Sequence, residues 1–97
     1  MAFQSQPFFL KKGESIGLVT TFGIGDADLG AQYFMASPRT DLGLFPQSGN
    51  AGFEVSRIQK WSWYSSETGF SYFSYTYTVT NVGDIDTNFV VDGGGNV

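Results

Sequence analysis

The chain has 97 residues, of which 41% are hydrophobic and 18% aromatic, enough to build the core of one small domain. Five basic and nine acidic residues give a net charge of −4, which disfavours binding to nucleic acid and to anionic membranes. Cysteine and histidine are both absent, which excludes disulfides, thiolate and imidazole metal sites, and the catalytic pairs that depend on either residue.

The N-terminal segment, MAFQSQPFFLKKGES, lacks the basic start and the apolar stretch of a signal peptide. No run elsewhere approaches the length of a membrane-spanning helix. We therefore expect a soluble chain without membrane insertion. The absence of cysteine does not indicate a location for it.

Alternation of apolar and polar residues predicts strands along most of the chain, and no window carries an uninterrupted helical pattern. Pro7 cannot donate to a strand ladder, which places the first predicted strand at a sheet edge or makes Pro7 its start. The expected strands, in chain order, cover Phe8–Lys11, Ser15–Phe22, Ala31–Ala36, Phe53–Val55 with Ile58–Tyr64 as one bent strand or two short ones, Phe70–Thr80 and Thr87–Val91.

Short connections rich in Gly, Asp, Asn and Ser separate these strands, as in β-hairpins. The stretch Ser37–Gly52 is the longest irregular piece, either a functional loop or a crossing between sheets. Six to eight strands at this spacing predict one all-β domain over residues 1–97, an antiparallel β-sandwich of Ig-like or jelly-roll-like type without substantial helix. We expect residues 93–97 to form a frayed tail.

The segment Tyr75–Asp92 reads YTYTVTNVGDIDTNFVVD. It resembles the ending of Ig-like repeat modules of bacterial surface proteins, in which a Thr-Val-Thr-Asn strand runs into a Gly-Asp turn. The resemblance covers this strand pair alone, and the first two-thirds of the chain do not match such a module. It implies a sandwich fold and a role in adhesion.

Two Gly-Asp-x-Asp turns contain the acidic residues that could carry chemistry, Asp26 and Asp28 in the first and Asp84 and Asp86 in the second. Paired carboxylates could hydrolyse a glycoside, but so small a domain rarely holds a cleft as well as a core, and we expect no enzyme. The four aspartates are candidate ligands for weakly bound calcium, which takes oxygen ligands from such loops. Neither turn matches an EF-hand, and the simpler interpretation is two solvated turns without any cofactor.

The span WSWYSSETGFSYFSYTYTV, residues 61–79, holds more aromatic rings than one sheet face can bury. Along residues 70–79 we expect the odd positions to face the core and the even positions to face outward. Trp61 and Trp63 share a face opposite to Tyr64, but a register slip of one residue would reverse which of them faces the core. We expect one tryptophan to be mostly buried, with Tyr64 or Tyr72 in a contact surface.

Exposed rings beside hydroxyl and amide groups have three interpretations: they stack on sugars, they form a subunit interface, or the long loop and the sheet twist cover them. The sequence predicts a non-enzymatic binding or assembly module that self-associates as a homo-oligomer or binds carbohydrate as a lectin does. The alternative is a structural subunit of a viral, phage or cell-surface assembly. The expected contact residues are Trp61, Trp63, Tyr64 and Tyr72 for stacking, with Asp84, Asp86 and Asn88 as polar groups that act directly or through calcium.

Overall fold

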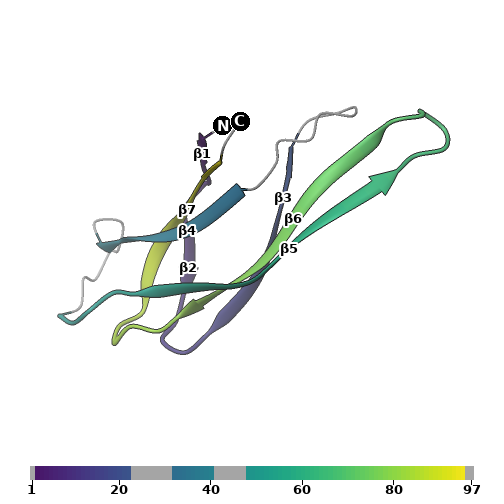
Figure 1. Cartoon of the computed structure of the whole chain (residues 1–97). Helices are drawn as coiled ribbons and strands as arrows, with labels where there is room; N and C mark the ends of the chain where they lie inside the picture. Colours follow the sequence, from purple (N-terminus) through teal and green to yellow (C-terminus); the bar gives the residue numbers. More distant parts are fainter. Residues whose placement is uncertain (1, 23–31, 41–47, 96–97) are drawn as a thin grey trace.

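The computed structural model describes residues 2–22, 32–40 and 48–95, which form seven strands in two antiparallel sheets with no α-helix among them (Figure 1). The strands are β1 (Ala2–Gln4), β2 (Phe8–Leu10), β3 (Ser15–Phe22), β4 (Gln32–Arg39), β5 (Phe53–Tyr64), β6 (Ser71–Asn81) and β7 (Thr87–Gly95). The all-β prediction is confirmed. Within these three ranges no helix has the length and apolarity that crossing a membrane requires.

The two sheets have a strand order that matches most of an Ig-like sandwich. Sheet A places β7 at its centre, with β4 along one side and β1 and β2 in succession along the other, whereas sheet B has the order β3-β6-β5. If β3 to β7 are assigned to Ig strands B to F, sheet B has the order B-E-D and β4 pairs with β7 as C pairs with F. The N-terminal strands β1 and β2 occupy the place of strand G beside F.

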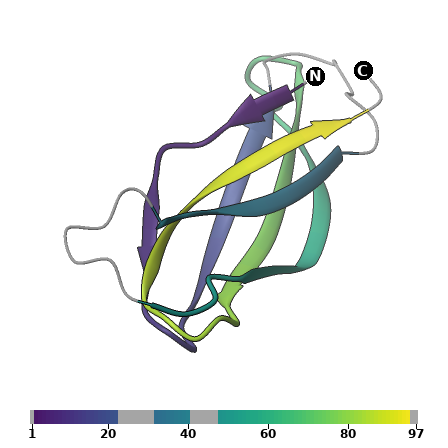
Figure 2. The same ribbon diagram turned by 90° about the vertical axis from the view of Figure 1, so that its left-hand side faces the viewer.

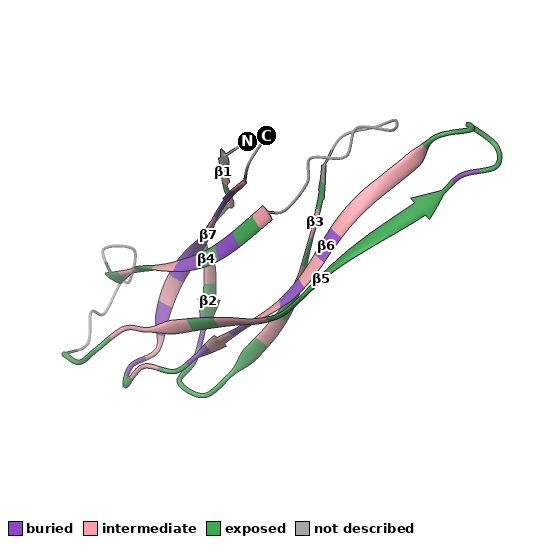
Figure 3. Ribbon diagram, in the orientation of Figure 1, coloured by how far each residue is buried: buried purple, intermediate pink, exposed green. Residues whose placement is uncertain are grey.

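The core lies between the sheets and consists largely of aromatic rings. In β6 the predicted alternation is confirmed, because Tyr75, Tyr77 and Val79 are buried while the even positions between them are half-buried (Figure 3). Phe34 of β4 stacks on Tyr77 across the core, with ring centroids 4.4 Å apart. Phe89 of β7 is completely buried. The sheets therefore pack face to face as a sandwich.

The β5–β6 hairpin is longer than the rest of the sandwich and gives the molecule its elongated shape of 51 × 21 × 20 Å (Figure 1). Figure 2 views the sandwich from the end opposite the hairpin tip. Sheet A faces the base of this hairpin, and every residue of β5 from Arg57 to Tyr64 is exposed (Figure 3). We call residues 59–76, which include the hairpin tip, the arm. Of the two predicted alternatives for this region, one bent strand or two short ones, the structure has one continuous strand.

The C-terminal glycines belong to a strand. The expected frayed tail over residues 93–97 is wrong for residues 93–95, and residues 96–97 lie outside the described part. Gly93 and Gly94 pair with Phe3 and Ala2 of β1, a strand of three residues that is too short to show an alternation in the sequence. A Cβ atom on Gly93 would lie 2.0 Å from the ring of Phe3, so the missing side chain leaves the room that this ring occupies.

The irregular stretch expected over Ser37–Gly52 is shorter in the structure. Strand β4 continues to Arg39, with Pro38 opposite Phe89 in the register. Proline is tolerated there because β4 pairs with β7 on one side and is an edge strand among the described strands. Residues 41–47 of this stretch lie outside the described residues.

Candidate functional site

The outer face of sheet B is the candidate site, and a β-bulge in β5 decides which side chains reach it. The register with β6 pairs Ser56 with Thr78 but Gln59 with Thr76, so one extra residue is inserted in β5. Arg57 in this bulge has a φ of 55°, the one positive value among the described residues other than glycine. The insertion reverses the alternation of β5, so that odd-numbered residues face the core before the bulge and face outward after it.

Three aromatic side chains on this outer face, Trp61, Trp63 and Tyr72, form what we call the aromatic strip. Trp63 lies opposite Tyr72, with ring centroids 5.6 Å apart and an angle of 34° between the rings. Trp61 donates its indole N–H to Oγ1 of Thr76 over 2.8 Å, which orients its ring. The tryptophans are 54% and 64% exposed. The expectation that one of them is mostly buried is therefore wrong, because the bulge turns both away from the core.

The turn at the tip of the arm holds the strip in register. The N–H of Ser65 donates to the carbonyl of Phe70 over 2.9 Å, and the N–H of Gly69 donates to the carbonyl of Ser65 over 2.8 Å. Gly69 has a φ of 75°, a left-handed conformation that glycine adopts without the steric penalty of a side chain. This hydrogen-bonded turn sets Trp63 opposite Tyr72.

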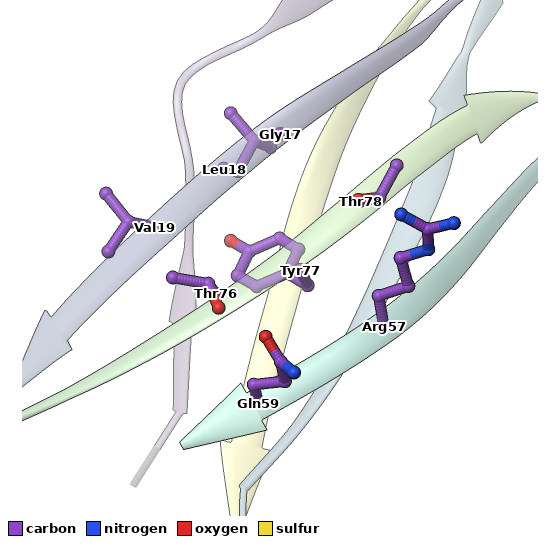
Figure 4. A pocket seen from close by; sticks show the side chains of 8 residues that line it. All are labelled: Gly17, Leu18, Val19, Arg57, Gln59, Thr76, Tyr77 and Thr78. Carbon is purple, nitrogen blue, oxygen red and sulfur yellow. The ribbon is translucent and has the colours of Figure 1, made fainter. Parts of the chain in front are cut away.

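A hollow of about 350 Å³ lies on the same face, next to the bulge, where β3, β6 and β5 run side by side (Figure 4). It is lined by Gly17, Leu18, Val19, Arg57, Gln59, Thr76, Tyr77 and Thr78. The polar side chains of this lining come from β5 and β6, and Gly17 of β3 contributes none. Thr76 both lines the hollow and accepts the hydrogen bond from Trp61, so the hollow and the aromatic strip are contiguous.

This face carries hydrogen-bonding groups and aromatic rings side by side. The hollow presents a guanidinium, an amide and hydroxyl groups, and the strip presents ring faces and edges. Neither a carboxylate nor a histidine is among the residues that line the hollow. The groups that are present donate and accept hydrogen bonds and stack, whereas general acid–base catalysis needs a group that exchanges protons near neutral pH.

Tyr64 lies on the opposite face of the arm from the aromatic strip. It is 62% exposed and pairs with Ser71 on the face that looks toward sheet A at the base of the hairpin. On that face the ammonium of Lys60 lies 5.1 Å from the ring centroid of Phe73 and 5.9 Å from that of Tyr75, where it covers part of the aromatic surface. The four predicted stacking residues therefore separate into three on one face and Tyr64 on the other.

Asn88 lies on the other side of the sandwich. It pairs with Phe9 and Arg39 on the outer face of sheet A, next to the completely buried Phe89. The core separates this face from the aromatic strip. The structure therefore does not bring Asn88 together with the tryptophans, because β7 belongs to the sheet that does not carry them.

Of the two predicted calcium turns, the structure describes only the second, and Asp26 and Asp28 lie outside the described residues. Asp86 accepts the backbone N–H of Lys12 over 2.8 Å, so its carboxylate links two turns of the fold. Among the residues that are described, no three acidic side chains gather to hold a metal ion, whereas calcium takes six to eight oxygen ligands. Asp84 and Asp86 follow the C-terminal end of β6, whereas the aromatic strip lies near the N-terminal end of β6. The two groups are therefore at opposite ends of this strand.

The carboxylate of Asp92, on the outer face of sheet A, accepts two side-chain hydrogen bonds. Asp92 accepts one from the hydroxyl of Ser37 and one from Nε2 of Gln4, the second over 2.9 Å. The bond from Ser37 contributes most to lowering the pKa of Asp92, followed by the bond from Gln4, and the positive charge of Arg39 adds to them. Burial acts in the opposite direction, but the pKa of Asp92 stays below its ordinary value.

We expect Asp92 to stabilise the folded protein at neutral pH and to lose this contribution in acid. Because its folded-state pKa is below the unfolded value, its contribution is complete above about pH 4 and is lost as the pH falls through the folded-state pKa. Asp92→Asn should therefore flatten the dependence of the melting temperature on pH below about pH 4, and Ser37→Ala should flatten it in part. Thermal melts at a series of pH values measure this, and an unchanged slope in both variants would contradict it.

Arg57, Gln59 and Thr78 line the hollow but are absent from the residues that the sequence singled out. Their place at the site depends on the bulge, which the alternation pattern of β5 alone does not reveal. The sequence does carry one signal for the hollow, Gly17 of β3, because a glycine inside a strand often marks a place where another group approaches the backbone.

Comparison of the chain with protein-family models, with curated proteins and with solved structures returns no match. The Ig-like strand order describes a fold that hosts many unrelated functions. The function is therefore inferred from the geometry of the site.

Proposed function

We propose that this domain is a non-catalytic carbohydrate-binding module whose site is the aromatic strip together with the adjoining hollow. The observation that carries the proposal is that exposed rings and hydrogen-bonding groups share one continuous face, joined where Trp61 bonds to Thr76. A sugar ring presents an apolar C–H face and a rim of hydroxyl groups. The rings of the strip suit the first, and the amide, guanidinium and hydroxyl groups of the hollow suit the second.

The strip is held in place before any ligand arrives. Trp61 is oriented by its hydrogen bond, and Trp63 rests against Tyr72 across the strand pair. Side chains that are already ordered lose less conformational entropy on binding, which favours affinity. Residues two apart along a strand are about 7 Å from each other. A linear oligosaccharide lying along β5 would therefore meet Trp63, Trp61 and the hollow in turn.

The charge of this face favours a neutral ligand. Arg57 is the only charged side chain among the residues that line the hollow, and the chain carries a net charge of −4. A polyanion would gain one favourable contact and meet repulsion from the rest of the molecule. A neutral oligosaccharide avoids that repulsion.

Tryptophan fluorescence reports on this site directly, because both tryptophans of the chain belong to the strip. We expect the emission to change on titration with at least one member of a panel of neutral oligosaccharides: β-glucans, α-glucans and oligomers of N-acetylglucosamine. Trp63→Ala should weaken that binding by about ten-fold, which corresponds to about 1.4 kcal/mol. Its melting temperature should change little, since the side chain is 64% exposed.

Tyr64→Ala is the matched control for this experiment. Tyr64 adjoins Trp63 in the sequence and is 62% exposed, but it points to the other face of the arm, so its variant should bind as the wild type does. Wild-type affinity in Trp63→Ala would contradict the proposed site. Absence of binding across the panel, with an oligomer that Trp63→Ala dissociates, would favour a structural subunit in which the strip contacts another copy.

A further inference from the structure

Strand β3 has a free edge among the described strands. It pairs with β6 on one side, and no described strand pairs with its other side. The N–H of Asn81 donates to the carbonyl of Glu14 over 2.9 Å, and this pair continues the β3–β6 register by one residue. The backbone N–H and C=O groups of the even-numbered residues of β3 therefore face β6. Because these groups alternate in antiparallel pairs, those of the odd-numbered residues point to the free edge. These residues are Ser15, Gly17, Val19 and Thr21.

This edge lacks the features that protect the edges of β2, β4 and β5 from pairing. Pro7 and two lysines flank β2, Pro38 and Arg39 lie at the end of β4, and the bulge at Arg57 breaks β5. Strand β3 has eight residues, SIGLVTTF, with no proline and no charged side chain. Long, uncharged edges of this kind pair with a further strand, and proteins that stay monomeric block them.

We propose that β3 pairs with β3 of a second copy of this chain, antiparallel about a two-fold axis that passes at Leu18. In this register Ser15 lies opposite Thr21 of the second copy, and Gly17 lies opposite its Val19. The backbone groups that point to the free edge are the ones that these pairs would join by hydrogen bonds. The two three-stranded sheets then become one sheet of six strands, with a closed two-fold symmetry.

The side chains of β3 fit this register. A Cβ atom on Gly17 would have no heavy atom within 4 Å, so there is open space beside it. Val19 is 64% exposed, and in the dimer it lies next to Gly17 of the other copy. Since Gly17 also lines the hollow, the second copy's Val19 would border the hollow on that side. Strand β3 brings no charged side chain to the contact, so like charges do not face each other along the paired strands.

Sedimentation over a range of protein concentrations tests the pairing. The wild-type chain is expected to show a reversible equilibrium between monomer and dimer. In Val19→Pro the lost N–H is one that points away from β6, so this variant should lose the dimer at every concentration and keep the fold of the monomer. Val19→Lys leaves the backbone unchanged and places a charge at the edge, and it should lose the dimer as well.

Two matched variants separate this contact from other surfaces. Met35→Lys introduces the same charge at a 64% exposed position of β4 and should leave the dimer intact. Trp63→Ala should also leave it intact, which makes the pairing independent of the carbohydrate proposal. A wild-type chain that stays monomeric overturns the pairing. A dimer that persists in both Val19 variants also overturns the pairing. The same holds for a dimer that is lost in Trp63→Ala but persists in the Val19 variants.

The register is tested by Leu18→Cys. The chain contains no cysteine of its own, so any disulfide must join the two introduced residues. At the two-fold axis the Cα atoms of this non-hydrogen-bonded pair would lie about 4.5 Å apart, within the range that a disulfide spans. Mild oxidation should therefore yield a single covalent dimer, and a Leu18→Cys dimer that does not cross-link would overturn this register.

Discussion

Replacement of Phe89 by alanine is expected to lower the free energy of unfolding by about 3 to 5 kcal/mol. Phe89 has no exposed surface, and its ring lies 4.6 Å from that of Phe53 and 5.6 Å from that of Phe8, measured between centroids. It therefore joins the centre of sheet A to both the N-terminal segment and β5. In a domain of this size each kcal/mol lowers the melting temperature by about 4 to 8 °C, so the loss is large enough for thermal melts and urea titrations.

Phe9→Ala is the control for Phe89→Ala. Phe9 is 55% exposed on the outer face of sheet A, opposite Asn88, so cutting its ring removes little packing. Its variant should stay within about 0.5 kcal/mol of the wild type. Equal losses in Phe9→Ala and Phe89→Ala would contradict the assignment of Phe89 to the centre of the core.

Replacement of Asn81 by alanine is expected to cost about 3 kcal/mol, although this side chain is polar. Asn81 is 1% exposed, and its Nδ2 donates to the carbonyls of Leu10 over 3.0 Å and Ile85 over 2.9 Å. Its Oδ1 accepts the N–H of Gly83 over 3.0 Å. Alanine would leave the two carbonyls without this donor, while the N–H of Gly83 keeps its bond to the carbonyl of Gly52 over 3.2 Å. Each unsatisfied buried group costs about 1 to 3 kcal/mol.

Asn81→Asp shows which of these bonds matter. An aspartate retains the acceptor for Gly83 but cannot donate to the two carbonyls, and it places a charge at a buried position. It should therefore be at least as destabilised as Asn81→Ala at neutral pH. Asn50→Ala is the neutral control, because the exposed Asn50 contributes its backbone carbonyl to this turn, as acceptor for the N–H of Asp84. A loss below about 1 kcal/mol in Asn81→Ala, measured by urea titration, would contradict the proposed role.

The role of Asn81 explains the Thr-Val-Thr-Asn ending that resembles Ig-like repeats. The asparagine closes the turn after β6 and also bonds to the end of β2, so one side chain ties two parts of the chain that lie far apart in the sequence. The sequence showed the pattern of this segment. The bond to Leu10 could not be predicted from it, because that bond depends on where the N-terminal strands lie in the folded chain.

The glycines at the C-terminal end differ from the expected frayed tail for a related reason. Gly93 and Gly94 carry no side chain that could show an alternation, and glycine-rich ends are often frayed. Their strand conformation comes from pairing with β4 on one side and β1 on the other. The ring of Phe3 then occupies the space beside Gly93, which any larger residue would fill.

By itself the sequence determined the all-β class, the approximate positions of the longer strands and the core face of β6. These follow from an alternation with a period of two, which is a local property of each strand. The sequence could not predict the three-residue strand β1 or which strands pair with each other, because neither leaves a residue pattern of its own.

Only the tertiary structure decided on which face the aromatic strip lies. Phe53, Val55, Trp61 and Trp63 are all odd-numbered, so an uninterrupted strand would point the tryptophans toward the core with Phe53 and Val55. The extra residue at the bulge next to Arg57 reverses the alternation and brings both tryptophans to the outer face. A bulge is a property of how β5 pairs with β6 and not of the residue pattern of β5, so the face of the site is fixed when the strands meet.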